Sequence, residues 1–169
     1  MNDRSPEDTS SSSYPERLEH GPYLDKFFPE VYSALGKTNG QLKKVYQDVD
    51  LSADLIELAL VRASQLNGCS ACLSIHVPRA RRAGVSQNKL DVLASWRETD
   101  AFSPYERAAL ELAETITLMP AGVRKADAPV KAMEIFTEEQ VAALTWAIIM
   151  INTYNRISIF SGHPPVTEL

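Results

Sequence analysis

Residues 52–84 read SADLIELALVRASQLNGCSACLSIHVPRARRAG, and this stretch predicts the pair of helices that decides the fold. Its apolar residues recur three and four positions apart, which is typical of a helix buried along one side. A serine can cap the first helix, and the Asn-Gly pair is a typical helix stop. The two helices are expected over 52–66 and 69–83, with stops at Asn67-Gly68 and Gly84.

The rest of the chain after residue 23 has the same helical periodicity, and alternating segments are scarce. Two capping boxes mark helix starts, at Ser103-Pro104-Tyr105-Glu106 and at Thr137-Glu138-Glu139-Gln140. We therefore predict an all-α fold, a single-domain bundle of about seven helices with short connections. The further helices are expected over 24–36, 41–47, 86–96, 103–118, 127–136 and 137–160, with breaks near Gly36 and Asn39-Gly40 and a loop at Pro120 and Gly122.

The length of 169 residues suggests one domain, which we place at residues 24–160. Residues 1–23, polar and Ser-rich, are expected to form a loosely ordered tail, and residues 161–169 a C-terminal tail. A net charge of −5 argues against nucleic acid as the main partner. No apolar run reaches the length of a membrane span, and no signal peptide is recognisable at the N-terminus. We expect a cytoplasmic protein that binds neither nucleic acid nor membrane.

Three local features give further expectations about the fold. The segment 141–151 is apolar nearly all round, which predicts a helix both central in the core and packed against another subunit, and hence a homo-oligomer. Pro78 should kink or break the helix over 69–83, because its ring crowds the preceding turn. We interpret two tryptophans, Trp96 and Trp146, as core residues. Three arginines, Arg79, Arg81 and Arg82, are interpreted as a solvated helix face.

The chain has only two cysteines, Cys69 and Cys72, in a Cys-x-x-Cys arrangement. A bridge between them would close a very short loop, and the stabilisation from a disulfide grows with loop length. The pair is therefore better explained as redox-active or metal-binding than as a structural staple.

Cys69, Cys72 and His76 fall within about 60° of one another on a helical wheel, so they share one face. Cys69 lies in the first turn, where the helix dipole and unpaired N–H groups favour a thiolate. His76 lies one turn after Cys72, close enough to exchange a proton with it. The helix terminus thus favours Cys69 as the nucleophile, whereas the histidine favours Cys72.

Glu57 interrupts an apolar helical run, and its neighbours on the helical wheel are Ile56, Leu60, Val61 and Ser64. Carboxylates in such surroundings gather at functional sites. The alternative is that the side chain simply reaches solvent, as glutamates usually do. The pattern alone leaves both interpretations open.

Together these residues give the pattern Glu57-x11-Cys69-x2-Cys72-x3-His76, which resembles the signature of the AhpD-like alkylhydroperoxidase branch of the carboxymuconolactone decarboxylase family. The resemblance extends over about residues 24–160. It implies an all-α fold that assembles as a homotrimer or homohexamer, with cysteine-based peroxidase activity. The similar segments are 60–69, 80–84, 94–99, 103–110 and 151–157, the last containing Asn155 and Arg156, to which we can assign no catalytic role.

The resemblance also implies roles for the site residues. Cys72 attacks the hydroperoxide and becomes a sulfenic acid, and Cys69 resolves it as a disulfide and donates a proton. Glu57 and His76 form a proton relay, a dithiol or thioredoxin-like protein is the reductant, and no cofactor or metal is needed. Dedicated family members often carry a histidine just before the second cysteine, where this chain has Ala71, so one relay member is missing.

Three other interpretations use the same residues. Cys69, Cys72, His76 and Glu57 are ligand types that zinc accepts. The wider family includes lactone decarboxylases, in which the cysteine pair would have no purpose. The third is a non-enzymatic thiol redox sensor or assembly module, in which the disulfide changes the contacts between subunits.

Overall fold

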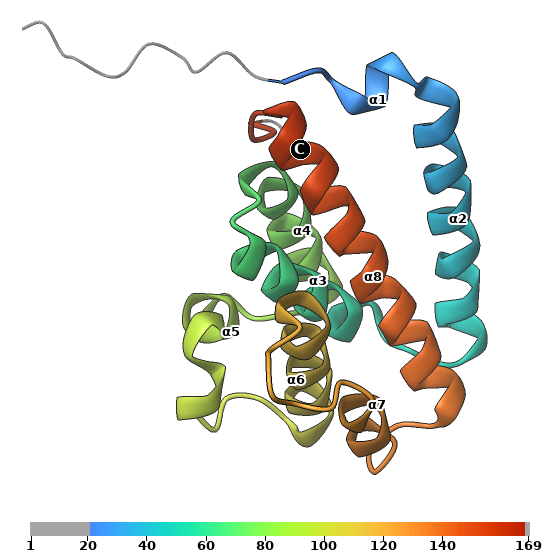
Figure 1. The fold of residues 1–169 in the computed structure, drawn as a ribbon. Coiled ribbons are helices and arrows are strands. Elements are labelled where there is room, and N and C mark those ends of the chain that lie inside the picture. The colour runs from blue at the N-terminus through green and yellow to red at the C-terminus, as the bar shows by residue number, and fades with distance from the viewer. Residues whose placement is uncertain (1–20, 168–169) are drawn as a thin grey trace, which may run out of the picture.

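The computed structural model describes residues 21–167, and within this range it contains eight α-helices and one 3-10 helix, η1 (Figure 1). The fold is all-α, as predicted. Residues 1–20 of the predicted N-terminal tail and the last two of the C-terminal tail lie outside the described range. The elements are α1 (Leu24–Phe27), α2 (Pro29–Asp48), α3 (Ala53–Asn67), α4 (Ser70–Ala83), α5 (Gln87–Val92), η1 (Leu93–Glu98), α6 (Pro104–Leu118), α7 (Asp127–Ala132) and α8 (Glu138–Ser161).

The centre of the bundle is α3, which packs against α4, α6 and α8. Five of its residues are inaccessible to solvent, Leu58, Ala59, Val61, Ala63 and Ser64. One hydrophobic cluster joins α3 to α6, α7 and α8, and a second joins it to α4, α5, η1 and α6. None of the helices in residues 21–167 has the length and hydropathy of a membrane span.

Helix ends follow the local signals in the sequence. The two predicted capping boxes are both formed, at Ser103 with Glu106 and at Thr137 with Gln140. Gly68 ends α3 with a φ of 69°, a left-handed conformation that a residue without a Cβ adopts at little cost. This tight turn brings the chain directly into α4 and so places the cysteine pair next to α3.

The predicted breaks near Gly36 and Asn39-Gly40 are wrong, because α2 runs without interruption from Pro29 to Asp48. Each helical glycine costs about 1 kcal/mol relative to alanine, which tertiary contacts can outweigh. Figure 1 shows α2 lying alongside α8, and Leu42 is its one buried residue. The chain bends instead at Phe28, just before the proline that starts α2.

Three other predicted elements differ from the structure. α4 continues through Pro78 without a break, held on both sides of the proline by packing of Leu73, Val77 and Ala80 against the core. The helix predicted over 86–96 is two elements, α5 and η1, with a non-helical Ser95 in the second. The helix predicted over 127–136 is shorter, since α7 ends at Ala132.

α8 is central, as predicted, with contacts to α1, α2, α3, α4, α6 and α7. The apolar residues of α8 extend over more of the helix surface than the neighbouring helices bury. Trp146 is therefore 52% exposed, contrary to its interpretation as a core residue, and Ile149 beside it is also exposed. Trp96, by contrast, is buried as predicted.

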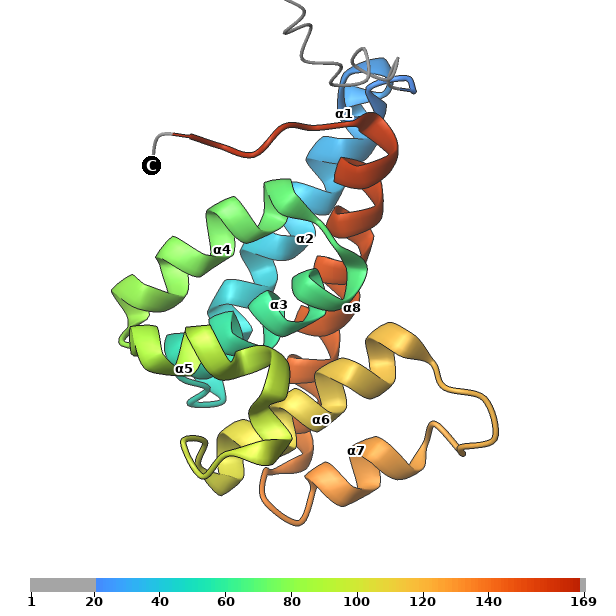
Figure 2. The same cartoon turned by 90° about the vertical axis from the view of Figure 1, so that its left-hand side faces the viewer.

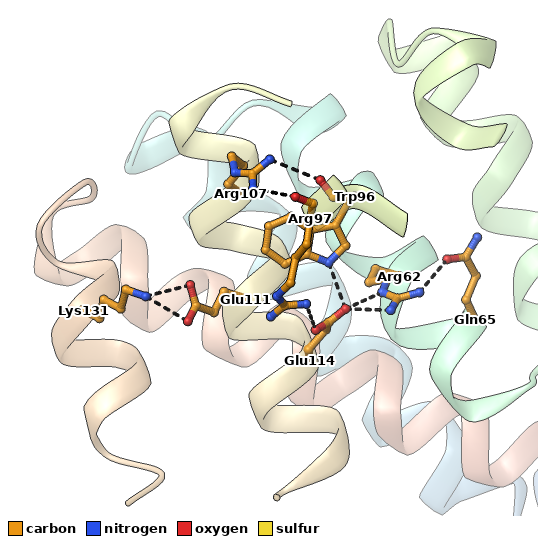
Figure 3. Close-up of polar contacts among 8 residues, drawn as sticks. All are labelled: Arg62, Gln65, Trp96, Arg97, Arg107, Glu111, Glu114 and Lys131. Carbon is orange, nitrogen blue, oxygen red and sulfur yellow. Dashed lines mark hydrogen bonds and ion pairs between the residues drawn. The ribbon is translucent and has the colours of Figure 1, made fainter. Parts of the chain in front are cut away.

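A polar cluster around Glu114 joins α6 to Arg62 of α3 (Figure 3). The Glu114 carboxylate accepts hydrogen bonds from Arg62 Nε at 2.8 Å and from Trp96 Nε1 at 2.9 Å, and it pairs with Arg97. It thereby ties α6 to α3 and to η1. Burial alone would raise the pKa of Glu114, but the three hydrogen bonds and the charge of Arg62 outweigh it and lower the pKa below its usual range.

We expect Glu114→Gln to lower the free energy of unfolding by about 2 kcal/mol at neutral pH, because Arg62 loses its charged partner in a site that is mostly buried. A lowered carboxyl pKa stabilises the fold above the ordinary value of 4.5, and that stabilisation is lost as the pH falls through the folded-state pKa. The difference in the free energy of unfolding between wild type and Glu114→Gln, measured by urea unfolding, should therefore become smaller in acid. Glu111→Gln, on the same helix in a more exposed pair with Lys131, is the control, and an equal loss there would contradict the prediction.

The end of the chain folds back over the bundle (Figure 2). The backbone N–H of Val166 donates to Ser74 Oγ of α4 at 2.8 Å. His163 Nε2 lies 3.1 Å from Asp25 Oδ1, and Leu24 N–H donates to Ser161 Oγ. These contacts hold α1, and with it the start of α2, against the end of α8.

Candidate active site

The α3–α4 turn positions the cysteine pair. Cys69 is the N-cap of α4, and Cys72 is the third residue of the helix. The two are joined by a disulfide, with their Cα atoms 5.3 Å apart. The backbone N–H of Cys72 donates to Cys69 Sγ at 3.3 Å, so the helix terminus directs a donor at the first sulfur, as the sequence suggested.

The two cysteines differ in their access to solvent. Both pack with Ala63, Ala71 and Ile151 in a small hydrophobic cluster. Cys69 is 1% exposed, whereas Cys72 is 5% exposed and contributes to the wall of a cavity that Cys69 does not line. A small molecule in this cavity can therefore reach Cys72 and not Cys69.

His76 and Glu57 form a direct pair across the α3–α4 interface. Nδ1 of His76 lies 2.7 Å from Oε2 of Glu57, and the two side chains are only 14% and 17% exposed. Both residues line the same cavity as Cys72. The Glu57 side chain therefore does not simply reach solvent, because it is mostly buried and paired with His76. Within the described residues no hydrogen bond joins His76 to either sulfur while the disulfide is formed.

The cavity has a volume of about 610 Å³ and lies between α2, α3, α4 and α8. Its wall combines apolar side chains with polar and charged ones, which include Asn39, Gln47 and Ser158. Volumes of about 300–1,000 Å³ are usual for sites that enclose organic molecules. The lining residues include Tyr32, Gly36, Lys43 and Tyr46 from α2, Ile56, Glu57 and Leu60 from α3, Cys72, Ile75, His76 and Arg79 from α4, and Met150, Ile151 and Tyr154 from α8.

Tyr46 is a site residue that the sequence did not reveal. Burial, with a smaller contribution from the negative charge of Glu57, raises the pKa of Tyr46 to about 12. Its hydroxyl therefore stays protonated at neutral pH and is available as a hydrogen-bond donor inside the cavity. The sequence gives no signal for this role, because Tyr46 joins the site only when α2 packs beside the core.

An asparagine cluster holds the turn before Cys69 against α8. Asn67 Nδ2 lies 2.8 Å from Oδ1 of both Asn152 and Asn155, and Asn155 Nδ2 donates to Ser64 Oγ at 3.1 Å. Arg156 in turn donates to Asn152. Asn155 and Arg156, for which the sequence gave no role, thus help to fix the position of the cysteine-bearing turn.

The zinc interpretation finds no support in the geometry. In the part of the chain that the structure describes, no three histidine, cysteine or acidic side chains are grouped so that they could hold a metal ion. Ala71 lies with the cysteines in their hydrophobic cluster and supplies no titratable group.

Comparisons with known proteins identify the family of this chain. Residues 29–115 match the model of the carboxymuconolactone decarboxylase family. The uncharacterized protein YdfG of Bacillus subtilis is 37% identical over 122 residues, which are 72% of this chain and 83% of that protein. A crystal structure from Agrobacterium tumefaciens, of a protein of unknown function described as a candidate AhpD antioxidant defence protein, superposes with a TM-score of 0.75 at 29% identity, over 89% of this chain and all of that one.

Proposed function

This chain belongs to the AhpD-like branch of the carboxymuconolactone decarboxylase family, and from that premise we propose that it is a cysteine-dependent peroxidase acting on alkyl hydroperoxides. The observation that carries the proposal is the Cys69–Cys72 disulfide at the start of α4, with one of its two sulfurs on a cavity that also contains a histidine–glutamate pair. A redox-active pair needs one sulfur on a cavity, because the substrate must reach that sulfur. The other sulfur must remain reduced, so that it can resolve the sulfenic acid.

In the first step the reduced Cys72 attacks the hydroperoxide. Its thiol gives up a proton through His76, which Glu57 holds by its Nδ1. The thiolate sulfur then bonds to the terminal oxygen of the hydroperoxide and the O–O bond breaks. The leaving alkoxide takes the proton from His76 and departs as an alcohol, and Cys72 becomes a sulfenic acid. The sulfur is oxidised by two electrons and the hydroperoxide is reduced by two.

In the second step Cys69 resolves the sulfenic acid. The Cys69 sulfur attacks the Cys72 sulfur, an S–S bond forms, and the hydroxyl leaves as water with the proton of the Cys69 thiol. The geometry supports this step, since the residues already lie within disulfide distance. A dithiol or thioredoxin-like reductant then restores both thiols by exchange.

Two further expectations concern partners. The exposed apolar residues Trp146 and Ile149 of α8 support a contact between copies of the chain, in a homotrimer or homohexamer. The reductant must reach the disulfide from the cavity side, because Cys72 is the sulfur that lines the cavity.

The proposal is tested with the fully reduced protein and one equivalent of cumene hydroperoxide. We expect two thiols per chain to be lost and one equivalent of cumyl alcohol to form. The same chain unfolded in urea is the control, since it carries the same thiols without the site. Folded protein should react at least about a hundredfold faster, the usual minimum for a positioned proton acceptor. Equal rates would contradict the proposal and leave the redox-sensor interpretation.

A further inference from the structure

We propose that the preferred substrates are hydroperoxides of carboxylate-bearing acyl chains, such as fatty-acid hydroperoxides, with Lys43 and Arg79 as the carboxylate-binding site. This inference rests on the proposed function and narrows it to one substrate class. Lys43 comes from α2 and Arg79 from α4, and both side chains line the cavity that contains Cys72.

The size and walls of the cavity indicate a long apolar substrate. Its volume of about 610 Å³ far exceeds what hydrogen peroxide needs, since a water molecule occupies only about 30 Å³ in the liquid. The apolar residues that line it include Ile56, Leu60, Ile75, Met150 and Ile151. Met150 is a flexible side chain that adapts to chains of different shape. Such a wall gains free energy from an alkyl chain and gains none from a small polar peroxide.

The two cations are unpaired. Within residues 21–167 neither Lys43 nor Arg79 has an ion-pair or hydrogen-bond partner, whereas five other lysines and arginines, from Arg62 to Lys131, are paired with carboxylates. Both side chains are exposed, so they lie where the cavity meets solvent. Arginine in particular binds carboxylates through two parallel hydrogen bonds.

The charges along the cavity also fix the orientation of the substrate. Glu57 is the one acidic residue among those that line the cavity, and it lies beside His76 at the reacting end. It repels a carboxylate from that end and tolerates the uncharged hydroperoxide group. Cys72, His76 and Arg79 follow one another along one face of α4, which places Arg79 about 10 Å beyond Cys72 along the helix axis. An acyl chain spans that distance with its carboxylate at the rim.

The test compares three substrates, linoleic acid hydroperoxide, its methyl ester and cumene hydroperoxide, with wild type and the double variant Lys43→Gln/Arg79→Gln. Wild type should reduce the acid with a kcat/KM about tenfold above that of the ester. The double variant should lose this preference through KM and reduce the ester and cumene hydroperoxide as wild type does. Equal kcat/KM for acid and ester in wild type would overturn the proposal.

Lys44→Gln/Arg81→Gln is the matched control. Lys44 and Arg81 are exposed and do not line the cavity, and the double substitution removes the same charge. If this variant loses the preference equally, the effect is one of net charge and the proposal is wrong. If none of the three hydroperoxides is reduced, the proposed function fails. The carboxylate-binding site can then still be tested by calorimetry, which compares the affinity for linoleic acid with the affinity for its methyl ester. Tighter binding of the acid that disappears in Lys43→Gln/Arg79→Gln supports the site, and equal binding refutes it.

Discussion

The Cys72→Ser variant is expected to leave alkyl hydroperoxides unreduced, with its remaining thiol intact after one equivalent has been added. Cys72 is the sulfur that lines the cavity, and a serine hydroxyl is not oxidised under these conditions. Cys69 keeps its thiol but lies 1% exposed behind the cavity wall. Mass spectrometry of the intact chain after peroxide treatment, together with a thiol count, measures the outcome.

The Cys69→Ser variant is the counterpart, and it should behave differently. Cys72 still reacts once, but no second thiol can resolve it, so the chain should gain one oxygen atom as a sulfenic acid that dimedone traps. It should then stop after a single turnover. If Cys72→Ser forms the trapped sulfenic acid and Cys69→Ser does not, the roles of the two cysteines are reversed. Cys69 would then be the nucleophile, as the helix terminus alone suggests.

The second large effect is expected from the histidine–glutamate pair. His76→Asn removes the group that takes the Cys72 proton, and the rate of sulfenic acid formation at neutral pH should fall by about 10²–10³. Glu57→Gln should lower the same rate by a similar factor, because it leaves His76 without the carboxylate 2.7 Å from its Nδ1. Stopped-flow measurement of a single turnover with the reduced protein gives this rate directly.

Two comparisons separate a proton relay from a structural contact. The double variant Glu57→Gln/His76→Asn should be little slower than either single variant, since residues that act as a unit are not additive. His163→Asn removes a histidine from a similar carboxylate pair, with Asp25, that does not line the cavity, and it should leave the rate unchanged. Additive losses, or an equal loss in His163→Asn, would show that the pair only supports the fold.

Local signals were sufficient to predict most of the fold. The capping boxes at Ser103 and Thr137 and the stop at Gly68 depend on hydrogen bonds within a few residues, and all three are formed. The errors arise where distant contacts prevail. Gly36 and Gly40 remain helical because α2 lies along α8. The helix predicted over 86–96 instead ends in η1, whose Trp96 and Arg97 are bonded to Glu114 of α6.

The site could be predicted only in part. Periodicity placed Cys69, Cys72 and His76 on one face, but it could not decide whether Glu57 faced solvent, because its partner His76 lies 19 residues away on another helix. Tyr46, Lys43 and the asparagine cluster were missed for the same reason. Each becomes part of the site only when α2 or α8 packs beside the α3–α4 pair.

The uneven attachment of α2 has a consequence for how the site could diversify. α2 supplies one wall of the cavity yet buries a single residue of its own, Leu42, whereas α3 and α8 supply other walls and a large part of the core. Substitutions along the cavity face of α2 therefore disturb few packed neighbours. The lining of the cavity can therefore change at these positions under weak selection for stability, while the cysteine pair and the histidine–glutamate pair remain anchored in helices that tolerate little change.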